Sequence, residues 1–246
     1  MKTTLPPEQR LIVAADFKPT GPNGKDWVRS QVLTLADSLK GTGVYIKVNS
    51  ALRVCGYDLI GEIQSRGLRV FADLKLFDIG ETLSTDGILL KETKPELLTT
   101  VCVAGVTAMQ ALKAELPDTE VLGVTVLTSL KLTDTENMFS ATIEESVMKF
   151  ALLAEIAGID GLICAPTDIA FIQKVLTRSM TFNTPAIRPT WAIVPGDDQN
   201  PDRIMTPEKA ISAGADRIVV GRPIVKSENP YDAVMRTIEE IASVDA

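Results

Sequence analysis

The sequence predicts an α/β fold of the (β/α)8 TIM barrel class, formed by a single domain that spans residues 1–246. Short apolar runs alternate eight times with stretches of helical period, as expected for repeated β-α units. The chain length is typical of such a barrel built as one domain, and no linker or low-complexity segment divides it. A doubly wound sheet is the alternative, but the first predicted turn lacks the GxGxxG pattern.

The eight apolar runs are rich in β-branched residues and are predicted as strands. They cover residues 10–17, 43–50, 69–77, 97–104, 121–128, 161–166, 181–188 and 217–224. The clearest helical periods lie between them or after them, at 26–41, 145–158 and 230–244. Glycines at 41, 158 and 214 are typical of helix ends, and Thr206-Pro207 is typical of a helix start.

Composition narrows the class of protein. A net charge of −7 and a pI near 4.8 argue against a nucleic-acid partner. Cys55, Cys102 and Cys164 are far apart, no CxxC pair occurs, and the chain has no His, so neither zinc binding nor a disulfide framework is expected. We therefore predict a reducing, cytoplasmic location. No run is long enough for a membrane span, and residues 1–17 lack signal-peptide architecture.

The strand at 69–77 carries charges where an ordinary strand would carry apolar residues. Because strand side chains alternate, Phe71, Asp73 and Lys75 share one face, and the wholly apolar other face suits the surrounding helices. Asp73 and Lys75 are thus expected inside the barrel, near the carboxyl end of the strand. Asp78 follows on the loop.

The same alternation turns two more charged residues inward. Asp16 shares a face with Ile12 and Ala14, and Lys47 shares a face with Tyr45. Catalytic groups of this fold lie at the carboxyl ends of the strands, which favours an active site at this mouth. The alternative is a structural ion network that fills the barrel mouth, although such buried networks stabilise proteins only weakly.

The carboxyl-terminal part of the chain predicts a phosphate site. Gly221 and Arg222 end the eighth strand, where glycine permits close backbone approach and the guanidinium suits a phosphate. Arg222 on a surface carboxylate is the competing interpretation. Residues 189–205 show no clear secondary structure, so they are predicted either as a closing lid that carries Gln199 or as a surface loop.

These residues resemble the orotidine 5'-monophosphate decarboxylase family. The resemblance rests on "DLKLFDI", "GVTVLTS", "TPAIRP", "GDDQ", "RIMTP" and "ISAGADRIVVGRPI", in the expected order along nearly the whole chain. It implies cofactor-independent decarboxylation of orotidine 5'-monophosphate, the last step of UMP biosynthesis, in a homodimer. The implied catalytic tetrad is Lys47, Asp73, Lys75 and Asp78, with Asp78 reaching the partner's site. The implied substrate-binding residues are Asp16 (ribose), Thr128 (pyrimidine edge), Gln199, Gly221 and Arg222 (phosphate), together with Arg188, Ile79 and Thr82.

The chain departs from the family pattern at Ala186, where glycine usually follows Thr-Pro, and at Phe77 and Cys102, where many bacterial relatives carry His. Two other functions remain open. A magnesium-dependent relative acting on a sugar phosphate would share the Asp-x-Lys-x-x-Asp pattern, but such relatives use a His. A non-catalytic barrel that binds a nucleotide phosphate would have no need of the tetrad.

Overall fold

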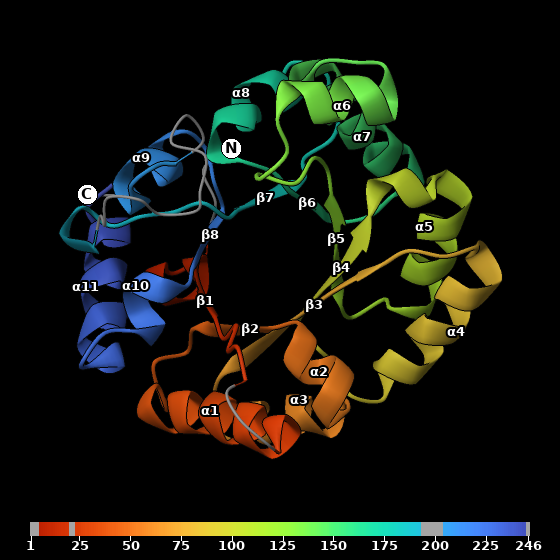
Figure 1. The fold of residues 1–246 in the computed structure, drawn as a ribbon. Coiled ribbons are helices and arrows are strands. Elements are labelled where there is room, and N and C mark those ends of the chain that lie inside the picture. The colour runs from red at the N-terminus through yellow and green to blue at the C-terminus, as the bar shows by residue number, and fades with distance from the viewer. Residues whose placement is uncertain (1–4, 20–22, 193–203, 245–246) are drawn as a thin grey trace.

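Eight parallel strands form a closed barrel, in which each strand pairs with the next along the chain and β8 pairs back with β1 (Figure 1). The structure is a computed structural model that describes residues 5–19, 23–192 and 204–244. The strands are β1 (Leu11–Ala14), β2 (Tyr45–Val48), β3 (Arg69–Leu76), β4 (Leu97–Val101), β5 (Glu120–Val124), β6 (Gly161–Ile163), β7 (Thr181–Thr184) and β8 (Arg217–Val220). The predicted fold class is confirmed.

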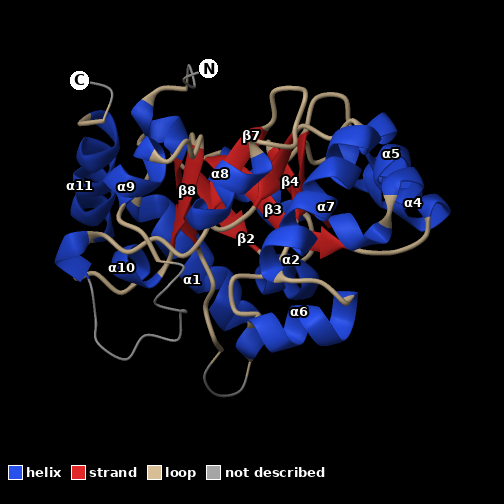
Figure 2. Cartoon of the chain, turned by 90° about the horizontal axis from the view of Figure 1, so that it is seen from above, coloured by secondary structure: helices blue, strands red, loops and turns tan. Residues whose placement is uncertain are grey.

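Helices form a ring around the barrel in Figure 1, and in the view of Figure 2 the strands lie between helices on the left and on the right. The α-helices of the described residues are α1 (Gly24–Ser38), α2 (Ser50–Cys55), α3 (Asp58–Gln64), α4 (Gly80–Lys91), α5 (Val106–Glu115), α6 (Leu132–Phe139), α7 (Ile143–Ala157), α8 (Ile169–Ile172), α9 (Pro207–Ser212), α10 (Arg222–Val225) and α11 (Pro230–Ala242). Short 3-10 turns are η1 (Pro7–Arg10), η2 (Cys102–Ala104), η3 (Pro166–Asp168) and η4 (Thr190–Ala192).

All eight predicted strands are confirmed, but each ends earlier than the apolar run that predicts it. The difference is four residues at β5, β7 and β8; at β7, for example, the run reaches residue 188 and the strand ends at Thr184. Apolar residues beyond the strands turn out of the ladder and still pack in the core, as Cys102 does in η2. Two predicted helix ends and one predicted start are confirmed: Gly158 caps α7 with φ +74°, Gly214 follows the cap of α9 with φ +104°, and the Thr206 hydroxyl accepts from the Lys209 amide at the start of α9. At Gly41 the prediction is late, because α1 ends at Ser38 and Leu39 caps it.

Alternation along the strands divides the core into two parts. One cluster fills the barrel and includes Ile12, Tyr45 and Phe71, whereas the larger cluster lies between the strands and the outer helices. An ion pair lies at the amino end of the barrel. Arg217 at the start of β8 pairs with Glu120 at the start of β5, with 2.8 Å between Arg217 Nη2 and Glu120 Oε2. This ion pair fills the amino end of the barrel, opposite to the carboxyl ends of the strands.

Candidate active site

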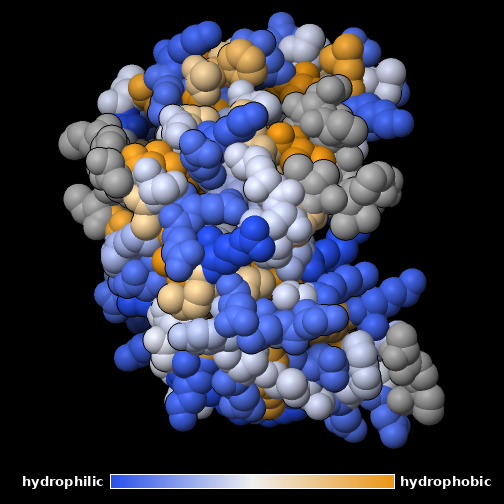
Figure 3. Space-filling model, turned by 90° about the vertical axis from the view of Figure 1, so that its left-hand side faces the viewer, coloured by the Kyte–Doolittle hydropathy of each residue, from blue (hydrophilic) through white to orange (hydrophobic). Residues whose placement is uncertain are grey.

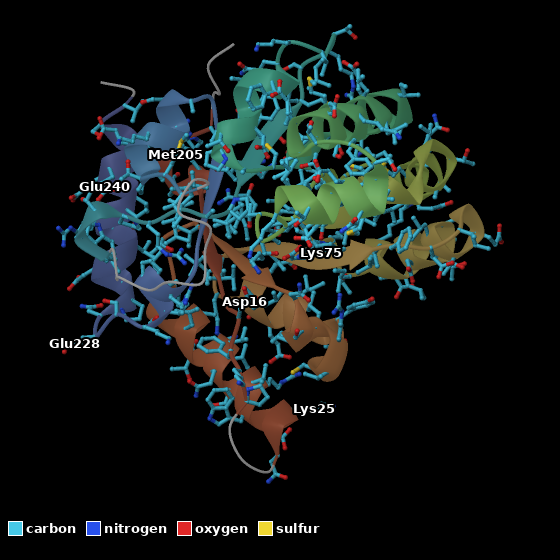
Figure 4. All side chains as sticks on the ribbon, turned by 45° about the horizontal axis from the view of Figure 1, so that its top comes forward. Asp16, Lys25, Lys75, Met205, Glu228 and Glu240 are labelled. Atoms are coloured by element: carbon cyan, nitrogen blue, oxygen red, sulfur yellow. The ribbon has the colours of Figure 1, made fainter. Side chains whose placement is uncertain are left out.

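A cavity of about 490 Å³ opens at the carboxyl ends of the strands. Its walls come from the ends of seven strands and the loops that follow, as this fold places its active sites. Eight predicted site residues line it: Asp16, Lys47, Asp73, Lys75, Thr128, Arg188, Gly221 and Arg222. Asp16 and Lys75 lie near the centre of the molecule in Figure 4, whereas the labelled Lys25, Glu228 and Glu240 lie at its periphery.

Four of these residues form a continuous row of alternating charge. Lys75 Nζ lies 2.6 Å from Asp73 Oδ2, and Lys47 Nζ lies 3.3 Å from the same oxygen. Lys47 Nζ also contacts Asp16 Oδ2 at 2.8 Å. Asp73 and Lys47 are buried, with 6% and 8% of their surfaces exposed, while the Asp16 side chain is about half exposed. The row therefore begins at the half-exposed Asp16, passes through the buried Lys47 and Asp73, and ends at Lys75, whose side chain is 31% exposed.

The row keeps its two buried members charged. Burial opposes the ammonium of Lys47, but Asp73 and Asp16 outweigh it and raise its pKa. Burial likewise opposes the carboxylate of Asp73, yet Lys47, Lys75 and a hydrogen bond from Thr99 lower its pKa. A buried anion thus lies on the cavity wall at neutral pH, which is costly unless it is both paired and hydrogen-bonded, as it is here.

A break in the strand ladder presents Lys75 to the cavity. Ala72 pairs with Leu98 of β4, but the next pair is Leu76 with Thr100, so β3 has two more residues than β4 in this interval. Lys75 lies in this bulge with φ +49°, a left-handed conformation that non-glycine residues rarely adopt. Such strained backbone is typical of functional sites.

The sequence patterns do not single out Thr99, which touches both Asp73 and Lys75 from β4. A threonine inside a strand is unremarkable because β-branched residues are common there. The sequence offers one partial signal for Thr99, which is that two polar residues, Thr99 and Thr100, are adjacent in a predicted strand. Both are fully buried in the structure. Their contacts become visible only once β3 and β4 are paired.

The other side of the cavity holds four residues predicted to bind substrate, of which Gly221 and Arg222 are predicted to bind the phosphate and Thr128 the pyrimidine edge. Gly221 and Arg222 follow β8, and Arg188 and Thr128 approach from the connections after β7 and β5. A Cβ added at Gly221 would meet the Cβ of Ala14 at 3.6 Å, an ordinary contact. The protein's own packing therefore does not require glycine at this position. A ligand that approaches the backbone closely at this position would require glycine there.

Three predicted residues lie outside the cavity of their own chain. Asp78 and Ile79 are exposed on the connection from β3 to α4, and Thr82 is exposed in the first turn of α4. Asp78 Oδ1 accepts from the Ile79 amide at 2.7 Å. Gln199 lies outside the described residues, as does most of the predicted lid. The described part of that segment contains the turn η4 and a bridge between Ile187 and Met205, so it is not wholly without regular structure.

Two further findings concern the described parts of the chain. Within residues 5–19, 23–192 and 204–244, no group of three or more His, Cys, Asp or Glu side chains is placed to hold a metal ion. No helix in these ranges has the length and apolar character needed to cross a bilayer.

Comparison with known proteins gives a consistent result. Residues 9–237 match the model of the "Orotidine 5'-phosphate decarboxylase / HUMPS family". Proteins named orotidine 5'-phosphate decarboxylase from Pseudomonas fluorescens (strain Pf0-1) and Gluconobacter oxydans (strain 621H) are 35% and 38% identical to the chain. These matches cover 94% and 95% of the chain, and 97% and 98% of the relatives. The crystal structure of the enzyme so named from Lactobacillus acidophilus matches with a TM-score of 0.75 at 25% identity, covering 95% of this chain and 99% of that one.

Proposed function

The chain belongs to the orotidine 5'-phosphate decarboxylase / HUMPS family, and we propose that it converts orotidine 5'-monophosphate to uridine 5'-monophosphate (UMP). The reaction is a cofactor-independent decarboxylation and the last step of UMP, and hence pyrimidine, biosynthesis. The observation that carries the proposal is the buried carboxylate of Asp73, held between two lysines on the wall of the cavity.

The chemistry explains why such a row of charges is needed. The bond from C6 to the carboxylate carbon breaks, CO2 leaves, and the electron pair stays on C6, where no π-system accepts it. Asp73 lies against the substrate carboxylate, a repulsion that ends as CO2 departs. Lys75 stabilises the developing carbanion and then transfers a proton from Nζ to C6. Preorganised charges of this kind act without a cofactor.

The remaining lining residues bind the rest of the nucleotide. Asp16 accepts hydrogen bonds from the ribose, and Thr128 contacts the edge of the pyrimidine. Arg222 and the Gly221 backbone bind the phosphate, together with Arg188 and Gln199. The largest rate enhancements of enzymes require roughly 20 kcal/mol of differential stabilisation, more than one residue supplies, so binding energy from the phosphate has to be realised in the transition state.

The same proposal includes a homodimer that shares its sites. Four apolar side chains, called here the apolar rim, are about half exposed or more on the connections after β2, β3 and β4: Val54, Phe77, Ile79 and Val103. The opposite side of the barrel, around α9 to α11, is mainly hydrophilic (Figure 3). Burial of the rim against a second copy would place Asp78 and Thr82 beside the partner's cavity, where Asp78 completes the tetrad.

Subunit exchange tests the shared site. Lys75→Ala and Asp78→Asn homodimers should each be nearly inactive, because every site lacks one member of the tetrad. When the two variants exchange subunits, one site of each mixed dimer collects both defects and the other collects none. Random pairing makes half the dimers mixed, so activity should return to about a quarter of wild type. A mixture that stays inactive after verified exchange would show that both residues act within one chain.

The reaction itself is tested by the ultraviolet absorbance of orotidine 5'-monophosphate, which should fall when purified protein is added. Lys75→Ala should nearly abolish this loss while the circular dichroism stays that of wild type. Extensive treatment with EDTA should leave the rate unchanged. Activity that disappears with EDTA and returns with magnesium would favour the sugar-phosphate branch of the family instead.

We also propose that residues 1–246 work as one barrel domain in the cytoplasm. No disulfide joins Cys55, Cys102 and Cys164 in the described part of the chain, which supports a reducing compartment. Partial proteolysis should give no separately folded fragment that retains half of the barrel, since the ladder closes from β8 to β1.

A further inference from the structure

The hydroxyl of Thr99 connects two of the charged residues described above. Thr99 lies in β4 and is fully buried. Its Oγ1 accepts a hydrogen bond from the backbone N–H of Lys75 at 2.9 Å and donates one to Asp73 Oδ1 at 2.9 Å. One side chain from a neighbouring strand therefore holds the backbone of Lys75 and the carboxylate of Asp73 at the same time.

The two hydrogen bonds have a fixed direction. A hydroxyl carries one hydrogen, and Oγ1 of Thr99 can only accept from the amide of Lys75, so its own hydrogen points to Asp73 Oδ1. The other oxygen, Oδ2, remains for the ammonium groups of Lys75 and Lys47. Thr99 thus fixes the plane of the carboxylate and decides which oxygen meets the lysines.

The bulge in β3 explains why a side chain is needed at this point. The ladder between β3 and β4 is interrupted from Ala72 to Leu76, and the N–H of Lys75 bonds to a side chain of β4 rather than to its backbone. Lys75 also holds its left-handed φ in this interval. The Thr99 hydroxyl replaces the missing ladder contact and holds the bulge in the conformation that aims Lys75 into the cavity.

We propose that Thr99 is a positioning residue, which acts through Asp73 and Lys75 to hold the acid and the proton donor in their reactive arrangement. The inference rests on the proposed decarboxylation for its kinetic consequences, but not for its effect on the carboxylate. It assigns to Thr99 no contact with substrate.

The neighbouring residue provides a matched control. Thr100 is also fully buried in β4, and its Oγ1 donates to the backbone carbonyl of Leu76 at 2.9 Å. It therefore stabilises the same bulge but reaches neither Asp73 nor the side of the strand that lines the cavity. Removal of either hydroxyl leaves one bulge contact unsatisfied, and only removal of the Thr99 hydroxyl frees the carboxylate.

The kinetic test compares Thr99→Val and Thr99→Ser with Thr100→Val. Valine keeps the shape of threonine without the hydroxyl, so Thr99→Val should lower kcat about 100-fold, as displaced catalytic groups do, and leave KM within about threefold. Thr99→Ser restores the hydroxyl and should recover kcat to within about threefold of wild type. Thr100→Val loses one buried hydrogen bond where Thr99→Val loses two, so it should lower the thermal midpoint by a smaller amount while kcat stays near wild type.

A measurement on the ligand-free protein separates this inference from the proposed function. The carboxyl carbon of Asp73 can be titrated by 13C NMR, with Asp73→Asn as the assignment control. Thr99→Val should raise the pKa of Asp73, because the Thr99 hydrogen bond favours the carboxylate. The charged groups that face Asp73 are Lys47 from β2, Lys75 from its own strand and, through Lys47, Asp16, and all of them remain in the variant.

The outcomes are distinguishable. A wild-type protein that does not consume orotidine 5'-monophosphate would end the proposed function, and the titration would still test the positioning of Asp73. A Thr99→Val protein with wild-type kcat and an unchanged titration would overturn the inference. Thr99→Ala is a second variant without the hydroxyl, so if valine is not tolerated, wild-type kcat and titration in the alanine variant would overturn it equally.

Discussion

Ala186 carries a backbone conformation that is costly for alanine, and Ala186→Gly measures that cost. The residue follows β7 beside Pro185, is 5% exposed, and lies on the wall of the cavity with φ +65°. Glycine adopts this left-handed conformation without penalty. The substitution therefore removes strain and a methyl group together.

The expected change in the free energy of unfolding follows from three terms. Relief of the left-handed conformation stabilises by about 1–2 kcal/mol. Loss of the buried methyl group destabilises by about 0.8 kcal/mol, and the greater freedom of glycine in the unfolded chain destabilises by about 0.4–1 kcal/mol. The sum lies within about 0.8 kcal/mol of zero, so Ala186→Gly should be nearly neutral.

Ala165→Gly is the matched control. Ala165 is fully buried near the end of β6, but its φ is −67°, where alanine is unstrained. It has no strain to relieve, so the glycine variant should lose about 1.2–1.8 kcal/mol. For a chain of this length, that corresponds to a fall of roughly 2–7 °C in Tm.

Urea unfolding followed by circular dichroism, with all three proteins at one pH and temperature, gives the comparison directly. The structure predicts that Ala186→Gly is more stable than Ala165→Gly by about 1–2 kcal/mol, the value of the strain alone. Equal losses in the two variants would refute the reasoning, because they would show that Ala186 is not strained in the native protein.

Two more predictions concern titratable groups and can be tested without substrate. Because the native pKa of Asp73 lies below its unfolded value near 3.9, its stabilising contribution is present above about pH 4 and is lost as the pH falls through the native pKa. Wild type should therefore lose more unfolding free energy between pH 6 and pH 2.5 than Asp73→Asn, and parallel losses in urea titrations would contradict this. Burial raises the pKa of the Cys102 thiol to about 12, whereas Cys55 is partly exposed. Iodoacetamide at pH 8 should therefore modify native protein at Cys55 and spare Cys102, as mass spectrometry of the digested protein would report.

The sequence alone determined which side chains of β3 face the barrel. Alternation is a local property of an extended chain, so Phe71 and Asp73 could be placed on one face without knowledge of any neighbour. Lys75 was assigned to the same face and does line the cavity, but it reaches it from a bulge with φ +49°, where regular alternation no longer holds. The same local reasoning placed Asp16 and Lys47 at the same mouth. Repetition of β-α units determined the class of fold, because parallel strands with intervening helices close in few ways.

The ends of the strands were determined less well. An apolar residue just beyond a strand is as buried as one within it, so hydrophobicity does not mark where ladder hydrogen bonds stop. The run that predicts β4 continues through Cys102, which packs in the core from a 3-10 turn. In such a case the apolar character of the sequence predicts that a residue is buried, but only the backbone hydrogen bonds between paired strands show where the strand ends.

The geometry of the site depended on contacts between distant residues, and only the tertiary structure decided it. Thr99 reaches Asp73 across 26 positions of sequence, because β3 and β4 pair with a bulge that no local pattern specifies. The left-handed φ of Lys75 and of Ala186 likewise exists because packing around them outweighs a local preference for other conformations. Side-chain alternation is set by each residue's immediate neighbours, whereas register, strain and hydrogen-bond partners are set by the whole closed barrel.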